Sequence, residues 1–478
     1  MAELKKTLSG TALVAVGAAG LIGSSFVYLS SQLFAEFSAG GVIIGMLLAT
    51  FLACCVALAI SELTSSFPRA GGEFVYAYLA FNRPVGFLMG WLAVGVFCGI
   101  VAFYVTATGF LLGQVIPALN TIPLYSIGGE AIHLPVLMIG LGMLFLNLWM
   151  NWYGTTVAFS IQVMMFITIV VLGLAVVFVG FDHGDISNFL PAFNEELTGR
   201  TSWSSVFSFV LPALGFLTGF SIVAILAEEA SVSARQVGRI VILSVVIAGA
   251  FYTLMFMATA WVIPWETTAS FSSGTIDAFR HAGFPIIAYL AFAIGVLGLL
   301  TTFLAVFSSV SRLLFSLARA GLLPKFLARI DNEQRIPRNA LLFTTVIGIA
   351  LGWLGPKSLV WLLNVGGVYV AMMWLLTVLT FYRLRKTLPS LHRPYRVRLT
   401  WFPAIGGVAA LLIIAANLLP GTGMTLKSNV EYMILCSWLV FGVLVYLFTG
   451  KDKSQQANLE DMLGDSYEAF AKAKAQNS

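Results

Sequence analysis

The sequence predicts an all-α polytopic membrane protein with twelve transmembrane helices. Hydrophobic residues make up 59% of the 478-residue chain and charged residues only 10%, against about 25% charged residues in an average soluble domain. The mean hydropathy is +0.93, and the apolar residues gather in runs long enough to cross a bilayer. A soluble fold could not hide that much apolar surface, so the composition excludes a cytosolic enzyme.

Twelve apolar segments stand out, each with the roughly 20 residues that a transmembrane helix needs. They are residues 10–35, 40–65, 84–116, 134–151, 153–180, 203–230, 236–263, 284–319, 338–354, 358–384, 401–420 and 430–449. The connections are short, and the longest are too small to be soluble domains. The first segment is too long for a removable signal peptide and lacks a cleavage site, so we interpret it as a retained span.

The positions of the basic residues predict that both termini lie in the cytoplasm. With the N-terminus inside, the inner segments are 1–9, 66–83, 231–239, 312–338, 383–398 and the tail. These segments hold 22 of the Lys and Arg residues, whereas the outer side holds four. Cytoplasmic loops are enriched in such residues. The same bias favours an even number of spans, and it accounts for the net charge of +5 without nucleic-acid binding.

Two of the predicted spans carry glycine-rich interruptions near their middle. The first span contains GAAGLIGSSF at 17–26, and the sixth contains LPALGFLTGFS at 211–221. In lipid, such breaks are tolerated where they line a cavity. Gly and Ser also permit close helix packing, but these two breaks open two successive groups of five spans. That spacing is typical of a 5+5 inverted repeat in which helices 1 and 6 are discontinuous.

The repeat divides the chain into six regions. They are a cytoplasmic N-terminus (1–9), a first repeat of helices 1–5 (10–180), an external loop (181–202), a second repeat of helices 6–10 (203–384), helices 11 and 12 (385–449) and a cytoplasmic tail (450–478).

The chemistry of a helix break suits a zwitterion. The half-helix after a break presents free N–H groups and a positive dipole end, which favour a carboxylate. The half-helix before it presents free carbonyl oxygens, which favour an ammonium group or a cation. A pair of breaks can therefore hold both ends of a small zwitterion without a charged side chain.

No Asp, Glu, Lys, Arg or His is predicted at mid-membrane depth, and Glu62, Glu228 and Glu229 lie at inner span ends. A polyamine carrier would be expected to supply buried acids, so their absence favours a neutral amino acid as the ligand. Carbonyls and aromatic faces also hold cations, which leaves an amine or polyamine ligand as the alternative. The histidines and cysteines show no catalytic or metal-ligand spacing, so we expect no enzymatic activity and no metal or cofactor.

Four motifs resemble one known family. ELTSSFPRAGGEFVYAYLAFNRPVGFLMGW at 62–91 is similar to its link between the second and third spans. GFSIVAILAEEA at 219–230 is similar to its sixth span. SRLLFSLARAGLLPKFLARIDNEQRIPRNAL at 311–341 and RLRKTLPSLHRPYRV at 383–397 resemble its links after the eighth and tenth spans. On these motifs, the chain is identified as a member of the amino acid–polyamine–organocation superfamily of permeases, of the bacterial amino acid permease type, over residues 8–450.

The resemblance implies a leucine-transporter-like fold with two further C-terminal helices. It also implies a secondary transporter or exchanger of the cell membrane that works by alternating access, with a small-molecule amino acid as substrate. The family binds the substrate carboxylate at the first break and the amine at the sixth, and an aromatic residue covers the substrate. Carried onto this chain, the substrate-binding residues are Ile22, Gly23, Ser24, Ser25, Phe216, Leu217, Thr218, Gly219, Phe220 and Ser221.

Two departures from the family pattern bear on the substrate and ion sites. Ser25 replaces the second glycine of the usual Gly-Ser-Gly, and Ser221 stands where many members have an acid. The fifth span has Ile169 at the position where proton-coupled relatives carry a lysine. The coupling ion, proton or sodium, is therefore left open, as is exchange without an ion.

Further candidates surround this site. We expect pocket-wall residues at Phe97, Tyr104 and Phe303, and an ion site at Ser308 and Ser309, whose oxygens suit a hard cation. We also expect an inner gate of Glu62, Glu228 and Glu229 with Arg312, and a pair between Arg69 and Glu73.

Overall fold

The chain folds into a bundle of long helices. The computed structural model describes residues 4–127, 130–153, 155–331, 333–419, 426, 428–449 and 455–476. The helices of the bundle are α1 (Gly10–Leu21), α2 (Ser25–Ser66), α4 (Arg83–Val115), α5 (Leu134–Tyr153), α6 (Thr155–His183), α8 (Ser202–Phe216), α9 (Ser221–Ile225), α10 (Ala234–Val262), α13 (Pro285–Arg319), α14 (Arg338–Gly352), α15 (Gly355–Thr387), α16 (Trp401–Leu418) and α17 (Asn429–Phe448).

Short elements cover the two ends of the bundle. The helices are α3 (Glu73–Ala80), α7 (Glu195–Thr198), α11 (Trp265–Ala269), α12 (Gly274–His281), α18 (Gln455–Leu463) and α19 (Tyr467–Ala475). The 3-10 turns are η1 (Pro117–Leu119), η2 (Ile186–Asn188), η3 (Thr218–Phe220), η4 (Ala227–Glu229), η5 (Lys325–Ala328) and η6 (Gly464–Ser466). Strands β1 (Pro123–Ile127) and β2 (Glu130–His133) pair antiparallel between α4 and α5, where the sequence analysis had no element.

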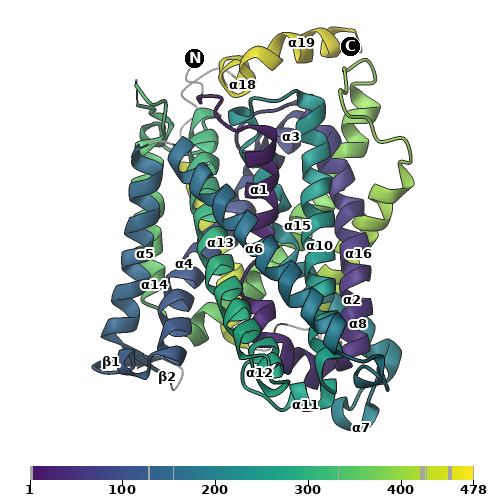
Figure 1. The fold of residues 1–478 in the computed structure, drawn as a ribbon. Coiled ribbons are helices and arrows are strands. Elements are labelled where there is room, and N and C mark those ends of the chain that lie inside the picture. Colours follow the sequence, from purple (N-terminus) through teal and green to yellow (C-terminus); the bar gives the residue numbers. More distant parts are fainter. Residues whose placement is uncertain are drawn as a thin grey trace.

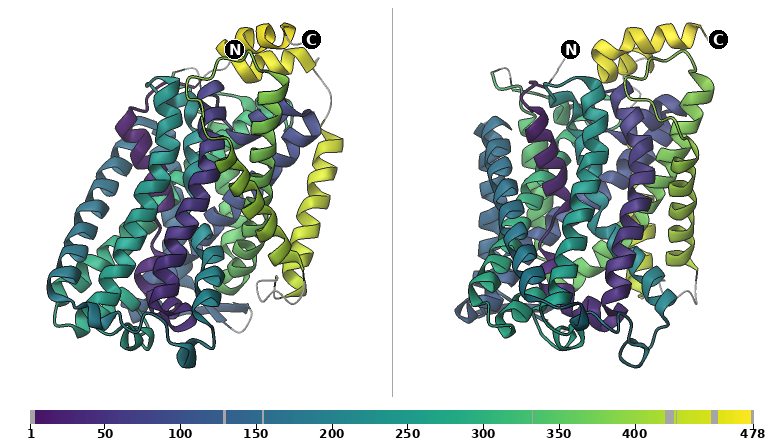
Figure 2. Two further views of the ribbon diagram at one scale, coloured as in Figure 1. Left: turned by 90° about the vertical axis from the view of Figure 1, so that its right-hand side faces the viewer. Right: turned by 45° about the vertical axis from the view of Figure 1, so that its right-hand side comes forward.

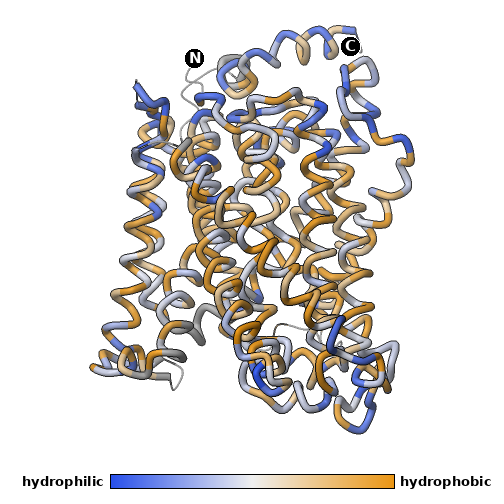
Figure 3. Tube along the Cα trace, in the orientation of Figure 1, coloured by the Kyte–Doolittle hydropathy of each residue, from blue (hydrophilic) through white to orange (hydrophobic). Residues whose placement is uncertain are grey.

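Both ends of the chain lie at the same end of the bundle (Figures 1 and 2). We call this end the termini end, and the end that carries β1, β2, α7, α11 and α12 the opposite end. Polar residues gather at both ends, and the helices between them are apolar (Figure 3). Within the described residues, ten helices are long and apolar enough to cross a membrane, and Gly10–Leu21 and Arg338–Gly352 are shorter apolar helices. The chain is therefore a multi-pass membrane protein.

The first predicted break is present. Helix α1 ends at Leu21, and Ile22, Gly23 and Ser24 are not helical before α2 begins at Ser25. The first and second predicted spans meet without a loop, because α2 continues through Ser38, which has a left-handed φ of 57° and an extended ψ of 160°. This residue redirects the chain where the sequence analysis placed a short connection.

The sixth span is also interrupted, but in a different way. Helix α8 ends at Phe216, the 3-10 turn η3 follows, and α9 resumes at Ser221. The sequence predicted a span to residue 230, whereas the helix ends at Ile225 and the next residues form η4. The first break is thus a short non-helical segment, whereas the sixth is a 3-10 turn, in which the backbone stays hydrogen-bonded in a tighter helix.

Candidate functional site

A cavity of about 640 Å³ lies against both helix interruptions. Gly20, Gly23, Thr218 and Gly219 form the wall at the breaks. Helices α4, α10, α13 and α15 supply the other walls, and the lining residues of α2 follow the break toward the opposite end. None of the described residues that line the cavity is Asp, Glu, Lys or Arg. The cavity therefore offers backbone groups, hydroxyls and apolar surface, but no ionised side chain.

Side chains from two other helices form hydrogen bonds with the backbone at the first break. The Tyr252 hydroxyl donates to the carbonyl oxygen of Leu21 at 2.6 Å and accepts a hydrogen bond from the Gly23 N–H at 3.0 Å. The Thr302 hydroxyl lies 2.9 Å from the carbonyl oxygen of Ala19 and 3.3 Å from that of Ile22. Sequence reasoning missed both residues, because a tyrosine or threonine within an apolar span is most often a packing residue.

The aromatic wall is formed by residues from three helices. Phe97 and Tyr104 of α4 and Phe216 of α8 line the cavity. Phe216 packs at a tilt on Tyr252, with ring centroids 5.4 Å apart. Phe303 is fully buried and stacks on Tyr104 at 5.9 Å, so it supports the wall from behind.

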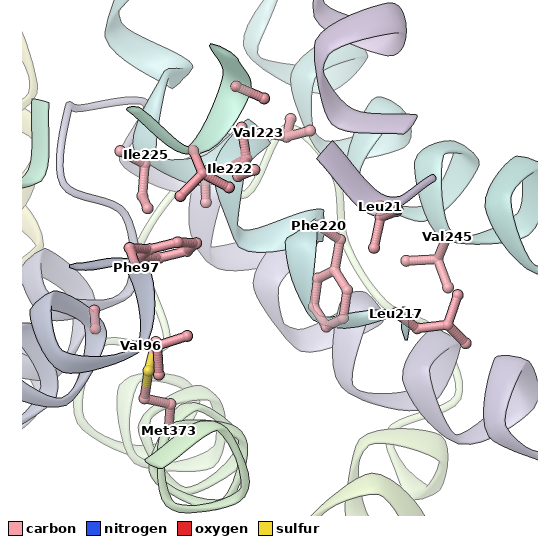
Figure 4. Close-up of a cluster of buried hydrophobic side chains, with 14 of the residues drawn as sticks. Leu21, Val96, Phe97, Leu217, Phe220, Ile222, Val223, Ile225, Val245 and Met373 are labelled. Carbon is pink, nitrogen blue, oxygen red and sulfur yellow. The ribbon is translucent and has the colours of Figure 1, made fainter. Parts of the chain in front are cut away.

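The predicted substrate-binding residues separate into two groups. Gly23, Phe216, Thr218 and Gly219 line the cavity. The others are buried beside it but are not among its lining residues, namely Ile22, Ser24, Leu217, Phe220 and Ser221. Figure 4 shows Leu217 and Phe220 in an apolar cluster with Leu21, and Phe220 also faces Trp374 at 5.6 Å. The side chain of Ser25 lies outside the described part of the structure. The binding role of each residue stays a prediction.

Buried ion pairs close the termini end of the bundle. Arg312 of α13 donates to Glu229 of η4 at 2.8 Å, and Arg319 of the same helix donates to Glu228 at 2.6 Å. Arg69 lies 3.5 Å from the Glu228 carboxylate. The N-terminal segment covers this cluster, because the Leu4 N–H donates to Glu228 and the Leu8 N–H donates to the carbonyl oxygen of Glu229. The expected partnership of Glu228 and Glu229 with α13 is present.

Opposite charges hold Glu228 ionised. Its burial raises the pKa, but the hydrogen bonds and charge of Arg319, the charge of Arg69 and the Ala70 N–H outweigh burial and hold the pKa at about 2. Removing one partner from such a buried pair costs about 3–5 kcal/mol, because it leaves an uncompensated charge. The cluster therefore holds α13, η4 and the segment before α3 together.

Glu62 belongs to a separate cluster. Its carboxylate is bound by Arg385 at 2.5 Å and by Arg393 at 3.1 Å, and it accepts a hydrogen bond from the Val397 N–H at 2.7 Å. These partners lie at the end of α15 and in the segment that follows it, so Glu62 anchors that segment to α2. The structure does not bring Glu62 to Arg312.

The two serines proposed as an ion site face different partners. The Ser308 hydroxyl donates to Asn151 at 2.8 Å, and the same Asn151 oxygen lies 3.3 Å from Arg312. The Ser309 hydroxyl donates to the carbonyl oxygen of Ala305 at 2.8 Å. It is Thr302, about two turns earlier on α13, that contacts the carbonyl oxygens of Ala19 and Ile22. An ion-binding role for the serines stays a prediction.

Glu73 is a buried acid without a cation. Only 2% of it is exposed, and its carboxyl forms a 2.5 Å hydrogen bond with the Ser221 hydroxyl. The expected pair with Arg69 is wrong, because Arg69 turns to Glu228. Burial raises the pKa of Glu73, and the hydrogen bonds from Ser221 and its own N–H lower it by less. An acid at a helix N-terminus gains about 0.3–1 kcal/mol, which is less than the several kcal/mol that burying a charge costs.

Comparison with known proteins finds related sequences along nearly the whole chain. The profile of a family described as "Amino acid permease" matches residues 7–443. A branched-chain amino acid permease of Lactococcus lactis is 24% identical over 460 residues, which cover 93% of this chain and 94% of that protein. A branched-chain amino acid permease of Bacillus subtilis is 24% identical over 464 residues, or 95% of each chain. Human cationic amino acid transporter 4 is 24% identical over 405 residues, which cover 81% of this chain and 61% of the relative.

Proposed function

Because the chain belongs to the amino acid permease family, we propose that it is a secondary active transporter of neutral amino acids with apolar side chains. The observation that carries the proposal is the cavity between two helix interruptions, which no described Asp, Glu, Lys or Arg lines. A zwitterion needs one anion-binding and one cation-binding group, and two broken helices supply both from the backbone.

The backbone at the breaks fits the two charged ends of an amino acid. The first turn of α2, which begins at Ser25, has N–H groups without intrahelical acceptors, and its positive dipole end favours the α-carboxylate. The C-terminal turn of α8, which ends at Phe216, has carbonyl oxygens that favour the α-ammonium group.

The apolar part of the cavity supports a bulky side chain as the third recognition element. Phe97, Ile100 and Phe103 line this part. Gly215, Gly366 and Gly367 also line the cavity, and a Cβ at any of the three would meet no other atom within 4 Å. This room suits a branched aliphatic or aromatic side chain, and two relatives are named as branched-chain amino acid permeases.

We further propose that the chain crosses the cell membrane twelve times in a 5+5 repeat, with the termini end in the cytoplasm. The excess of Lys and Arg at that end supports this orientation. The cavity then extends from the breaks toward the outside, and the ion pairs of Glu228 and Glu229 close the inner side. This is the outward-facing arrangement of an alternating-access carrier.

Uptake of labelled leucine into liposomes that contain the purified protein tests the proposal. We expect saturable uptake and counterflow, with competition by isoleucine and phenylalanine but not by putrescine. Competition by putrescine or ethanolamine, without competition by neutral amino acids, would favour an amine carrier. Flux that neither saturates nor exchanges would identify a channel.

A further inference from the structure

Glu73 lies where the segment before α3 meets the sixth span. Helix α3 packs against α4, α15, α2 and α9. The Gly71 N–H donates to the carbonyl oxygen of Ile225 at 3.3 Å, and a Cβ on Gly72 would stand 3.1 Å from the Ile225 nitrogen. The start of α3 is therefore seated on the backbone of α9, and the Ser221 hydroxyl at the first residue of α9 contacts the Glu73 carboxyl.

The charged groups around Glu73 have other partners. Within the described part of the chain, Glu73 forms no ion pair, and its side-chain partner is Ser221. The arginines of the surrounding elements contact other acceptors, namely Arg69 and Arg319 with Glu228, Arg312 with Glu229, Arg385 and Arg393 with Glu62, Arg383 with the Ala80 carbonyl and Arg83 with the Gly321 carbonyl. The neighbouring titratable group, Tyr76, is buried in α3 itself and carries no positive charge. A carboxylate in this position would be uncompensated, so the closed arrangement favours the protonated acid.

Opening the termini end would change which form of Glu73, protonated or ionised, is more stable. Helix α9 continues into η4, which carries Glu228 and Glu229, so separation of η4 from α13 moves the segment on which α3 rests. Water would then reach Glu73, its carboxylate would be solvated, and the proton would leave. The burial that favours the neutral acid also raises the pKa of Glu73 in the closed state. The closed state therefore holds one more proton than the open state.

We propose that Glu73 binds the proton that drives this carrier, and that the Ser221 hydroxyl couples its protonation to the sixth-span break. The inference rests on the proposed transport function and adds the coupling ion. Thr218 and Gly219 line the cavity, and Ser221 follows two residues later. Glu73 takes up its proton while the inner side is closed, and the Ser221 hydroxyl, which donates to the Glu73 oxygen at 2.5 Å, links the protonated acid to the sixth-span break. The proton leaves Glu73 when the inner side opens, so each cycle carries one proton inward with one amino acid.

The test uses the full chain in liposomes that contain a pH-sensitive dye, with the outside more acidic than the inside. For the wild type, we expect external leucine to cause inward proton movement and leucine accumulation. For Glu73→Gln, we expect loss of the leucine-dependent proton influx and a drop of about tenfold or more in gradient-driven accumulation, with a smaller drop in leucine counterflow. Ser221→Ala should also lose proton influx. Glu333→Gln, which removes an exposed acid outside the site, should behave as wild type.

Each outcome decides between the two proposals. Leucine accumulation by the wild type without proton influx, or full proton influx in Glu73→Gln, would overturn the role of Glu73 while leaving the transport function intact. Absence of leucine exchange in the wild type would reject the transport function, and the coupling role with it. If Glu73→Gln does not fold, Glu73→Asp replaces it, and we expect it to keep proton influx with a shifted pH dependence. An unshifted pH dependence in Glu73→Asp would contradict the proposal.

Discussion

At the scale of single residues, Tyr252 ties the first helix break to α10. Its hydroxyl contacts both the Leu21 carbonyl and the Gly23 N–H, and its ring packs on Phe216 of the cavity wall. One side chain therefore positions backbone at the first break and an aromatic side chain next to the sixth.

Replacing Tyr252 with phenylalanine should loosen the first break. The change removes two hydrogen bonds, each with a net contribution of about 0.5–1.5 kcal/mol, and keeps the ring. We expect the apparent affinity for leucine to fall about tenfold, measured by competition in liposomes. Tyr289→Phe is the matched control, because Tyr289 is 70% exposed. Equal affinities in the two variants would show that the hydroxyl does not position the break.

Gly219 permits the close contact between the two breaks. A Cβ at this residue would stand 2.4 Å from the carbonyl oxygen of Gly20, which is part of rigid backbone. We expect Gly219→Ala to push α1 and η3 apart and to abolish uptake, while protein still reaches the membrane. Gly142→Ala serves as the control, because a Cβ there meets nothing within 4 Å. Normal uptake by Gly219→Ala would contradict the predicted role of this contact in substrate binding.

The pKa values of Glu228 and Glu73 predict opposite effects of pH. The pKa of Glu228 is lowered from 4.5 to about 2, so the contribution of its ion pairs to stability is present above the ordinary pKa and is lost only as the pH falls from there to about 2. The pKa of Glu73 is raised, so its contribution to the closed state is complete at low pH and is lost as the pH rises through the raised pKa.

This difference gives a test by thermal stability. Between about pH 5 and 8, Glu73 is the one of these two acids that can make the unfolding temperature depend on pH. This pH dependence should therefore disappear in Glu73→Gln and persist in Glu228→Gln. Glu228→Gln should instead lower stability at every pH in that range by about 3–5 kcal/mol, the cost of breaking a buried ion pair from one side. A pH dependence that disappears in Glu228→Gln alone would refute the assignment.

At the scale of elements, the C-terminal helices α18 and α19 cover the termini end of the bundle, where Glu228 and Glu229 pair with arginine (Figure 1). Met462 and Leu463 of α18 are fully buried, Phe470 of α19 is 6% exposed, and the Phe470 ring meets Phe67 edge-on at 6.3 Å. Arg69, which lies beside Glu228, also donates to the carbonyl oxygen of Met462 at 3.2 Å. The tail is thus attached to the same arginine that lies beside Glu228.

Deleting residues 451–478 should therefore destabilise the closed state. Each buried apolar side chain of the tail contributes about 1.5–3 kcal/mol relative to an exposed one, so we expect a lower unfolding temperature. We also expect faster reaction of a cysteine placed at Phe67 with reagent added from the cytoplasmic side. A chain shortened only by the last two residues, 477–478, is the control. An unchanged unfolding temperature and unchanged reactivity would show that α18 and α19 do not stabilise the gate.

At the scale of the whole molecule, the two ends of the bundle differ in charge. The proposed cytoplasmic end carries most of the Lys and Arg residues, and Glu62, Glu228 and Glu229 at that end are paired with arginine. The lipid-facing middle is apolar (Figure 3). Orientation in the membrane should therefore follow from the basic residues alone.

Single cysteines at the two ends test this orientation in intact cells. An impermeant thiol reagent should label Glu195→Cys, in α7 at the opposite end, and should not label Glu333→Cys until the cells are opened. The wild type reports background labelling of its own four cysteines. Labelling of Glu333→Cys in sealed cells would reverse the proposed orientation.

Much of the architecture could be predicted from the sequence. The apolar segments, the interruptions within 17–26 and 211–221 and the acids at the ends of spans could all be read locally, because lipid favours continuous apolar helices and tolerates breaks where they line a cavity. The turn at Ser38, the hairpin of β1 and β2 and the end of the sixth helix at Ile225 depend on neighbouring packing, and the sequence did not predict them.

The sequence by itself determined that this chain spans a membrane, where its helices break, and that backbone groups are the main polar groups at those breaks. Only the tertiary structure decided which arginine pairs with which glutamate. It also decided that Tyr252 and Thr302 form hydrogen bonds with the backbone of the first break, and that the side-chain partner of Glu73 is a serine. The physical reason is distance along the chain. Burial in lipid acts on each segment separately, whereas the Ser221–Glu73 contact joins residues 148 positions apart and forms only when the bundle brings α3 against α9.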